Sequence, residues 1–199
     1  MVFWASKLYA ASDPDHTGNT YNRMLYATTR DFVTFTAAKI WQDRGSSRID
    51  STVIKEGNTF HRFTKDEGAV TGCSDIIQER ADSLVAVDDV QDPAHDPSAP
   101  AWSIVASCIG RAAGTSAVEG PTVFKANPGD TSGSPYYLFV DEYGGRGYIP
   151  LGTDDLNHPR WTVPNSYSLP TSPRHGTVLP ITQQELDRLD PDAGPPPLP

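Results

Sequence analysis

Short runs of alternating hydrophobic and polar residues dominate the chain and predict β-strands separated by turns. Residues 23–29 carry aromatic and β-branched side chains in rough alternation, and residues 31–35 follow them as a turn into the next strand. Similar turns recur at residues 81–84 and 153–156. A tryptophan follows each turn, at unequal distances: Trp41, Trp102 and Trp161. The pattern indicates an all-β fold built from similar units.

Three stretches open alike and place a reactive side chain at the same position. They read Ile49-Asp50-Ser51-Thr52-Val53-Ile54, Val118-Glu119-Gly120-Pro121-Thr122-Val123-Phe124 and Arg174-His175-Gly176-Thr177-Val178-Leu179. In each, a polar residue is followed by a short segment of small residues, a threonine and an apolar strand. The first two also continue alike, since Lys55 answers Lys125 and Asp66-Glu67 answers Asp141-Glu142. This internal repeat predicts that Asp50, Glu119 and His175 converge if the units surround an axis.

The length of the repeating units predicts a β-propeller. Units of roughly 50 to 70 residues, each with about four short strands, are typical of propeller blades. The 18 prolines and 16 glycines favour a loop-rich β protein over a helix bundle. Residues 1–189 therefore form one predicted domain, with a helix of one or two turns only at residues 182–189. Residues 190–199 are a Pro-rich tail, which we expect to be disordered or to begin a linker.

Charge and hydropathy exclude two classes of partner. A net charge of −9 leaves no basic patch to neutralise phosphates, so we expect no nucleic-acid partner. No apolar run approaches the roughly 18 residues of a membrane span, so we expect no membrane partner. For Cys73 and Cys108 we expect two free thiols, with one disulfide between them as the alternative. Neither forms a Cys/His cluster of the kind that binds zinc.

Two carboxylates brought together from different units are what glycoside hydrolysis needs. In an inverting glycosidase, one carboxylic acid protonates the leaving oxygen and one carboxylate activates water, about 6.5–9.5 Å away. The acid works with a raised pKa, which a nearby negative charge provides. Glu119, at the head of a strand and next to Gly120-Pro121, is the predicted acid, and Asp50 is its predicted negative neighbour. The alternative is that both are exposed acids at strand ends.

Other side chains in these stretches are candidates for substrate binding. His175 is expected near the axis with the two carboxylates, although a buried structural histidine is the alternative. Arg174 could bind sugar hydroxyls or restrain a carboxylate, or it could be a surface charge. Trp4, Phe63 and Tyr143 could stack on a sugar face, and core packing is the alternative for each.

Taken together, these motifs resemble glycoside hydrolase family 43, which comprises arabinofuranosidases, arabinanases, β-xylosidases and relatives built on a five-bladed β-propeller. The likeness runs from Met1 to about Leu189. Its motifs are specific for the family only when they are taken together. It rests on the three stretches above together with Phe3-Trp4-Ala5-Ser6-Lys7 and Phe63-Thr64-Lys65-Asp66-Glu67. The resemblance implies that Glu119 is the general acid and Asp50 the residue that modulates its pKa. It implies that His175 lies near the axis, where some members hold a calcium ion through water; no cofactor is required.

The chain departs from the family pattern at its start. The family's general base, an aspartate of the first blade, has no match, since Asp13 and Asp15 precede a Gly/Asn loop. We therefore expect an N-terminally truncated, incomplete propeller of about three to three and a half blades. Its open edge would be a site of association.

The function that the resemblance implies is inverting hydrolysis of α-L-arabinofuranosyl or β-D-xylosyl linkages in plant polysaccharides. The expected partner is an arabinose- or xylose-containing glycan, and the expected location is extracellular, although the chain has no signal peptide. The alternative is a non-catalytic propeller fragment that binds carbohydrate or protein. A propeller of unrelated function would require the triple repeat to be a coincidence.

Overall fold

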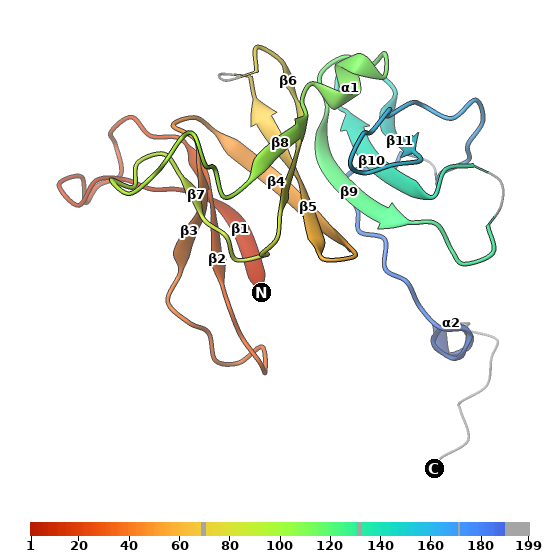
Figure 1. Ribbon diagram of the computed structural model, residues 1–199, viewed down its shortest axis with the longest axis horizontal. Coiled ribbons are helices and arrows are strands. Elements are labelled where there is room, and N and C mark those ends of the chain that lie inside the picture. The colour runs from red at the N-terminus through yellow and green to blue at the C-terminus, as the bar shows by residue number, and fades with distance from the viewer. Residues whose placement is uncertain (69–70, 131–132, 171, 190–199) are drawn as a thin grey trace.

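Three β-sheets stand side by side in the computed structural model, which describes residues 1–68, 71–130, 133–170 and 172–189 (Figure 1). The all-β prediction is confirmed, since within these residues the only helices are two short ones. None of the helices in the described ranges is long and apolar enough to cross a membrane. The predicted tail, residues 190–199, lies outside the described residues.

The first sheet has the order β1-β2-β3-β7. Its strands are β1 (Val2–Lys7), β2 (Asn22–Ala27), β3 (Lys39–Asp43) and β7 (Asp88–Asp89). The pairs β1–β2 and β2–β3 are antiparallel, and β3–β7 is parallel. The predicted strand at residues 23–29 is β2, and β1 pairs only with β2 in the described part of this sheet.

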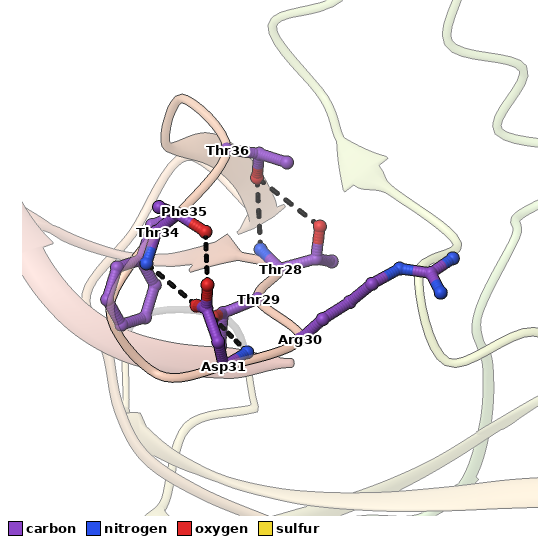
Figure 2. Close-up of a pocket in the computed structure, with 7 residues that line it drawn as sticks. All are labelled: Thr28, Thr29, Arg30, Asp31, Thr34, Phe35 and Thr36. Carbon is purple, nitrogen blue, oxygen red and sulfur yellow. Dashed lines mark hydrogen bonds between the residues drawn. The ribbon is translucent and has the colours of Figure 1, made fainter.

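The predicted turn after β2 is a loop that its own polar side chains hold together (Figure 2). The Asp31 carboxylate accepts backbone N–H bonds from Val33 at 2.9 Å and Thr34 at 2.8 Å. These bonds, that of Thr34 first, keep the pKa of Asp31 far below its usual value. The loop surrounds a shallow pocket with Phe35 on its wall. In Figure 1 the β2–β3 loop lies at the lower end of the first sheet, whereas α1 lies at the upper end of the second and third sheets.

The second and third sheets repeat one design. The second has the order β4-β5-β6-β8 and the third β11-β10-β9. Their strands are β4 (Arg48–Glu56), β5 (Thr59–Glu67), β6 (Ser74–Ala81), β8 (Ser103–Ala106), β9 (Glu119–Lys125), β10 (Tyr136–Glu142) and β11 (Gly147–Thr153). Lys55 pairs with Phe60 in one hairpin, and Lys125 pairs with Tyr136 in the other. The internal repeat read from the sequence is confirmed for these two units.

Two cores fill the spaces between sheets. One joins the first and second sheets around Met24, Trp41 and Trp102, and the other joins the second and third around Phe63 and Leu138. All three turn-following tryptophans are buried. Two indole N–H groups donate across units, Trp41 to the Leu84 carbonyl and Trp161 to Gln78 Oε1, and Trp102 donates to the Ala86 carbonyl within the β6–β8 connection. Burial with a satisfied N–H fixes each indole in place, and Trp41 and Trp161 thereby link neighbouring units.

The structure corrects two expectations in the loops. Cys73 and Cys108 form a disulfide, with Cα atoms 5.9 Å apart, so the expectation of two free thiols is wrong. The bond ties the segment before β6 to the start of α1 (Ile109–Ala112). Residues 174–179 converge with the other repeats but form no strand, so the third unit repeats only the head of the motif.

The predicted C-terminal helix is confirmed as α2 (Gln183–Leu189). Thr182 and Glu185 form a reciprocal cap at its start: Thr182 N–H donates to Glu185 Oε2 at 2.7 Å, and Glu185 N–H donates to Thr182 Oγ1 at 3.2 Å.

Candidate active site

Asp50 belongs to β4 but has no pairing partner on β5. The pairing between β4 and β5 shifts between Ile49 and Ser51, so that Asp50 is left out of the ladder as a β-bulge. Its φ is 47°, a left-handed conformation that is costly for a residue with a Cβ. Bulges redirect side chains, and strained residues gather at functional sites. The Asp50 carboxylate is aimed at the neighbouring sheet, where Oδ2 accepts the backbone N–H of Gly120 at 3.2 Å.

Glu119 begins β9 at the equivalent place in the third sheet. It pairs with Asp141, and the register then shifts before Thr122 pairs with Phe139, which leaves Gly120 in a second bulge. Gly120 has a φ of 56°, and a Cβ there would lie 2.8 Å from the imidazole ring of His175. Glycine is therefore required twice, by the backbone conformation and by the close approach of His175. This explains why Glu119 is followed by glycine.

His175 lies between the two carboxylates. Its Nε2 is 3.2 Å from Glu119 Oε1, and its Nδ1 is 4.0 Å from Asp50 Oδ2. The loop that carries it is held against β9, because the Thr122 hydroxyl donates to the Gly176 carbonyl. The predicted convergence of Asp50, Glu119 and His175 is thus confirmed as geometry, whereas their chemical roles stay predictions.

A third carboxylate, Asp141, completes the cluster and was not predicted as a site residue. It is fully buried at the end of β10, and its Oδ2 pairs with Arg174 Nε and lies 3.5 Å from His175 Nε2. Arg174 Nη2 is also 3.8 Å from Glu119 Oε1. Arg174 thus joins Glu119 and Asp141. This contact agrees with one of its predicted roles, the restraint of a carboxylate. The sequence signal for Asp141 was its match to Asp66 in the repeat, but nothing in the sequence brings Arg174 to it.

The three aromatic candidates differ in exposure, since Tyr143 and Trp4 keep open surface and Phe63 does not. Phe63 is 0% exposed and packs edge-on against Trp161, with ring centroids 5.6 Å apart, so it cannot stack on a sugar. Its prediction as a binding residue is wrong, because it lies in the core between the second and third sheets. Trp4 keeps 37% of its surface exposed on β1, and its role in sugar binding stays a prediction.

The cluster could offer ligands to a cation. One atom each from Glu119, Asp141 and His175 lies within 4.8 Å of the others. Calcium, however, takes six to eight oxygen ligands. The guanidinium of Arg174 already pairs with the same Asp141 oxygen that faces His175. These residues fit an ion-pair network better than a calcium site, and a calcium ion held by His175 through water stays a prediction.

Comparison with known proteins identifies the family. Residues 1–187 match the family described as "Probable glycosyl hydrolase domain", which is related to glycoside hydrolase family 43. The chain belongs to this family. It is also 34% identical over 187 residues to an α-L-arabinofuranosidase of Bifidobacterium longum subsp. longum. That match covers 85% of this chain but only 17% of the relative's length. The resemblance to glycoside hydrolase family 43 is confirmed, and Asp50, Glu119, Asp141, Arg174 and His175 all lie within the matched residues.

Proposed function

We propose that this chain is a glycoside hydrolase domain that cleaves α-L-arabinofuranosyl or β-D-xylosyl linkages in plant polysaccharides with inversion. The observation that carries the proposal is the contact of Glu119 with His175 and Arg174 beside Asp50, in a chain of a glycosyl hydrolase family. The name of the Bifidobacterium relative favours an arabinofuranosyl substrate.

Glu119 would act as the general acid that protonates the glycosidic oxygen as the bond breaks. Its side chain keeps 26% of its surface exposed, so a substrate can reach the carboxyl group. His175 and Arg174 hold the Oε1 side of this group and fix its direction. Asp50, which the Gly120 N–H orients, would supply the negative charge that keeps a proton on the acid. Acid catalysis of this kind contributes about 10²–10⁴-fold in rate.

Asp141 is the third carboxylate of the cluster, and we propose that it is not the general base. A base must reach a water molecule on the open side of the sugar. Asp141 is fully buried and paired with Arg174, so it orients neighbours and does not activate water. The base would therefore come from outside this cluster, as the resemblance implies. The step that this cluster supplies is protonation of the leaving group.

We also propose that the three sheets are consecutive blades of a five-bladed propeller, with the cluster near its axis. The support is the repeated start of β4 and β9, each with a bulge that carries or adjoins an acidic residue facing His175. The disulfide between Cys73 and Cys108 supports the proposal of an extracellular location, because disulfides persist in oxidising compartments.

The experiment is hydrolysis of aryl α-L-arabinofuranosides and aryl β-D-xylosides by this chain, with Glu119→Gln as the variant. We expect release of the aryl alcohol by the wild-type chain and a loss of about 10²-fold or more in the variant. Phe35→Ala, in the loop of Figure 2, is the control and should retain full activity. Activity that survives Glu119→Gln would overturn the assignment of the acid.

The second candidate is a non-catalytic domain that binds carbohydrate or protein. Two observations favour it: the burial of Asp141, whose carboxylate is already paired with Arg174, and the position of β1 as an edge strand with one partner in the described first sheet. An edge strand can pair with another chain. A folded wild-type chain that binds arabinose-containing oligosaccharides but releases no product would favour this candidate.

A further inference from the structure

A cavity of about 590 Å³ opens next to the cluster, with Asp141 and Arg174 in its lining. Asp141 and Arg174 line both the cavity and the cluster, so Arg174 is a shared wall. The rest of the lining comes from the β10–β11 turn, from the start of β11 and from residues within 167–170 and 172–174. The turn lies at the Glu119 end of the third sheet, because Asp141 pairs with Glu119 and Glu142 pairs with Gly147.

The walls of the cavity carry tyrosine rings with open surface. Tyr143 and Tyr167 are each 45% exposed, although both belong to the lining, and Tyr148 contributes a third, mostly buried ring. The Lys65 ammonium lies 5.7 Å from the ring centroid of Tyr143 and supports it from the second sheet. Flat aromatic faces with a polar tip suit a pyranose or furanose ring, whose C–H face is apolar and whose rim carries hydroxyls.

The polar groups of the cavity are fixed in place and their charges are balanced. Arg146 Nε donates to Glu142 Oε2 at 2.6 Å, and Glu142 Oε1 accepts the Ser116 N–H at 2.6 Å. Arg174 is held in the same way by Asp141. Each guanidinium therefore keeps N–H groups for a ligand but carries a paired charge. A neutral ligand fits this balance better than an anionic one.

We propose that this cavity binds a second sugar residue of the substrate, a neutral unit of the same glycan next to the unit held at Glu119. The inference rests on the proposed function. The volume lies in the range of ligand pockets, roughly 300–1,000 Å³, and aromatic walls with a few fixed donors are typical of such pockets. Tyr143 and Tyr167 would stack on the sugar, and Arg146 and Arg174 would donate to its hydroxyls.

The test is calorimetric binding of an arabinose-substituted xylo-oligosaccharide and of methyl α-L-arabinofuranoside, both in the Glu119→Gln background to prevent turnover. Adding Tyr143→Ala or Tyr167→Ala should weaken oligosaccharide binding about fivefold to tenfold and leave monoglycoside binding unchanged. Tyr143→Phe should retain binding, because the ring remains. Phe35→Ala, an exposed aromatic of the β2–β3 loop, is the matched control and should have no effect.

The outcomes separate this inference from the proposed function. If the Glu119→Gln chain, the parent of the double variants, binds the oligosaccharide and the added Tyr143→Ala or Tyr167→Ala leaves this binding unchanged, the second sugar site is overturned while the function at Glu119 stands. If an oligosaccharide with a uronic acid branch binds more tightly than the neutral one, the assignment to a neutral sugar is overturned. If the parent binds neither ligand and the wild-type chain hydrolyses no glycoside, both proposals fail.

Discussion

The second and third sheets carry a buried aspartate at the same place and give it different partners. Asp66, at the end of β5, pairs with Arg48 of its own sheet and accepts the Gly68 N–H, the Thr71 N–H and the Thr71 hydroxyl. Asp141, near the end of β10, pairs with Arg174 and faces His175, both from a loop outside its sheet. One oxygen of Asp141 has no hydrogen-bond partner among the described residues.

The difference shows how a repeated frame becomes a site. Where the aspartate is satisfied within its own sheet, it closes a loop and supports the fold. Burial raises the pKa of Asp66, but the Thr71 hydroxyl and Arg48 outweigh burial, so that the net shift is downward and the charged form is stable. Where the aspartate is paired with a loop outside its own sheet, it positions Arg174 and His175 against Glu119. Each prediction below tests one part of this contrast.

The largest expected effect is on stability, from Asp66→Asn. The substitution leaves Arg48, which is 2% exposed, with a buried and unpaired charge. Breaking such a pair costs roughly 3–5 kcal/mol. Asp141→Asn should cost only about 1–2 kcal/mol, because the Arg174 side chain is 57% exposed and its charge stays in contact with water. Urea unfolding of both variants gives the two values.

The loss of kcat should be larger for Asp141→Asn than for Asp66→Asn, which is the opposite of the order expected for the loss of stability. Asp141→Asn should lower kcat because Arg174 and His175 lose their anchor, whereas the folded fraction of Asp66→Asn should keep nearly normal kcat. Equal losses of stability in the two variants, with unchanged kcat in both, would remove the distinction between a structural and a positioning aspartate.

The next effect concerns the disulfide, which belongs to the second sheet only. Cys73 and Cys108 are 35 residues apart, and a bond that closes such a loop contributes about 2–4 kcal/mol to folding. Reduction should therefore lower the midpoint of thermal unfolding. A Cys73→Ser/Cys108→Ser variant should unfold at the midpoint of the reduced protein and respond to no reductant. An unchanged midpoint on reduction would show that the loop is held by its other contacts alone.

A smaller effect is expected from Gly120→Ala, which places a methyl group 2.8 Å from the His175 ring. The ring would have to leave Glu119, so kcat should fall while the free energy of unfolding drops by about 1–3 kcal/mol. Gly57→Ala is the matched control: its φ of 58° is nearly the same as that of Gly120, and nothing lies within 4 Å of the added carbon. Both variants carry the backbone strain, and only Gly120→Ala should lose activity.

The smallest effect concerns the acid limb of the stability profile. The Arg146 side chain lowers the pKa of Glu142 from 4.5 to about 2 in the folded chain. A lowered folded pKa stabilises the protein above pH 4.5, and this contribution is lost as the pH falls toward 2. Glu142→Gln should therefore flatten the profile between these values. Glu67→Gln, at the matching and exposed position of β5, is the control for the substitution itself.

Much of the frame was predictable because it repeats. The matched heads of β4 and β9 placed Asp50 and Glu119 at equivalent positions, and the turns followed by tryptophans marked the units. Phe63 was assigned wrongly, because a strand aromatic in a repeat can face either the core or the axis, and the side is fixed by the neighbouring sheet. Asp141 was missed because its partner Arg174 lies 33 residues further along the chain, in a loop without regular structure.

The measurement that tests the central claim most directly compares the loss of kcat/KM in Glu119→Gln between substrates with different leaving groups. An α-L-arabinofuranoside with 4-nitrophenol as its leaving group needs little protonation, whereas one with an alkyl or sugar leaving group needs a full proton from the acid. If Glu119 is the general acid, the variant should lose at least about tenfold more kcat/KM on the second substrate than on the first. An equal loss on both substrates would contradict the account.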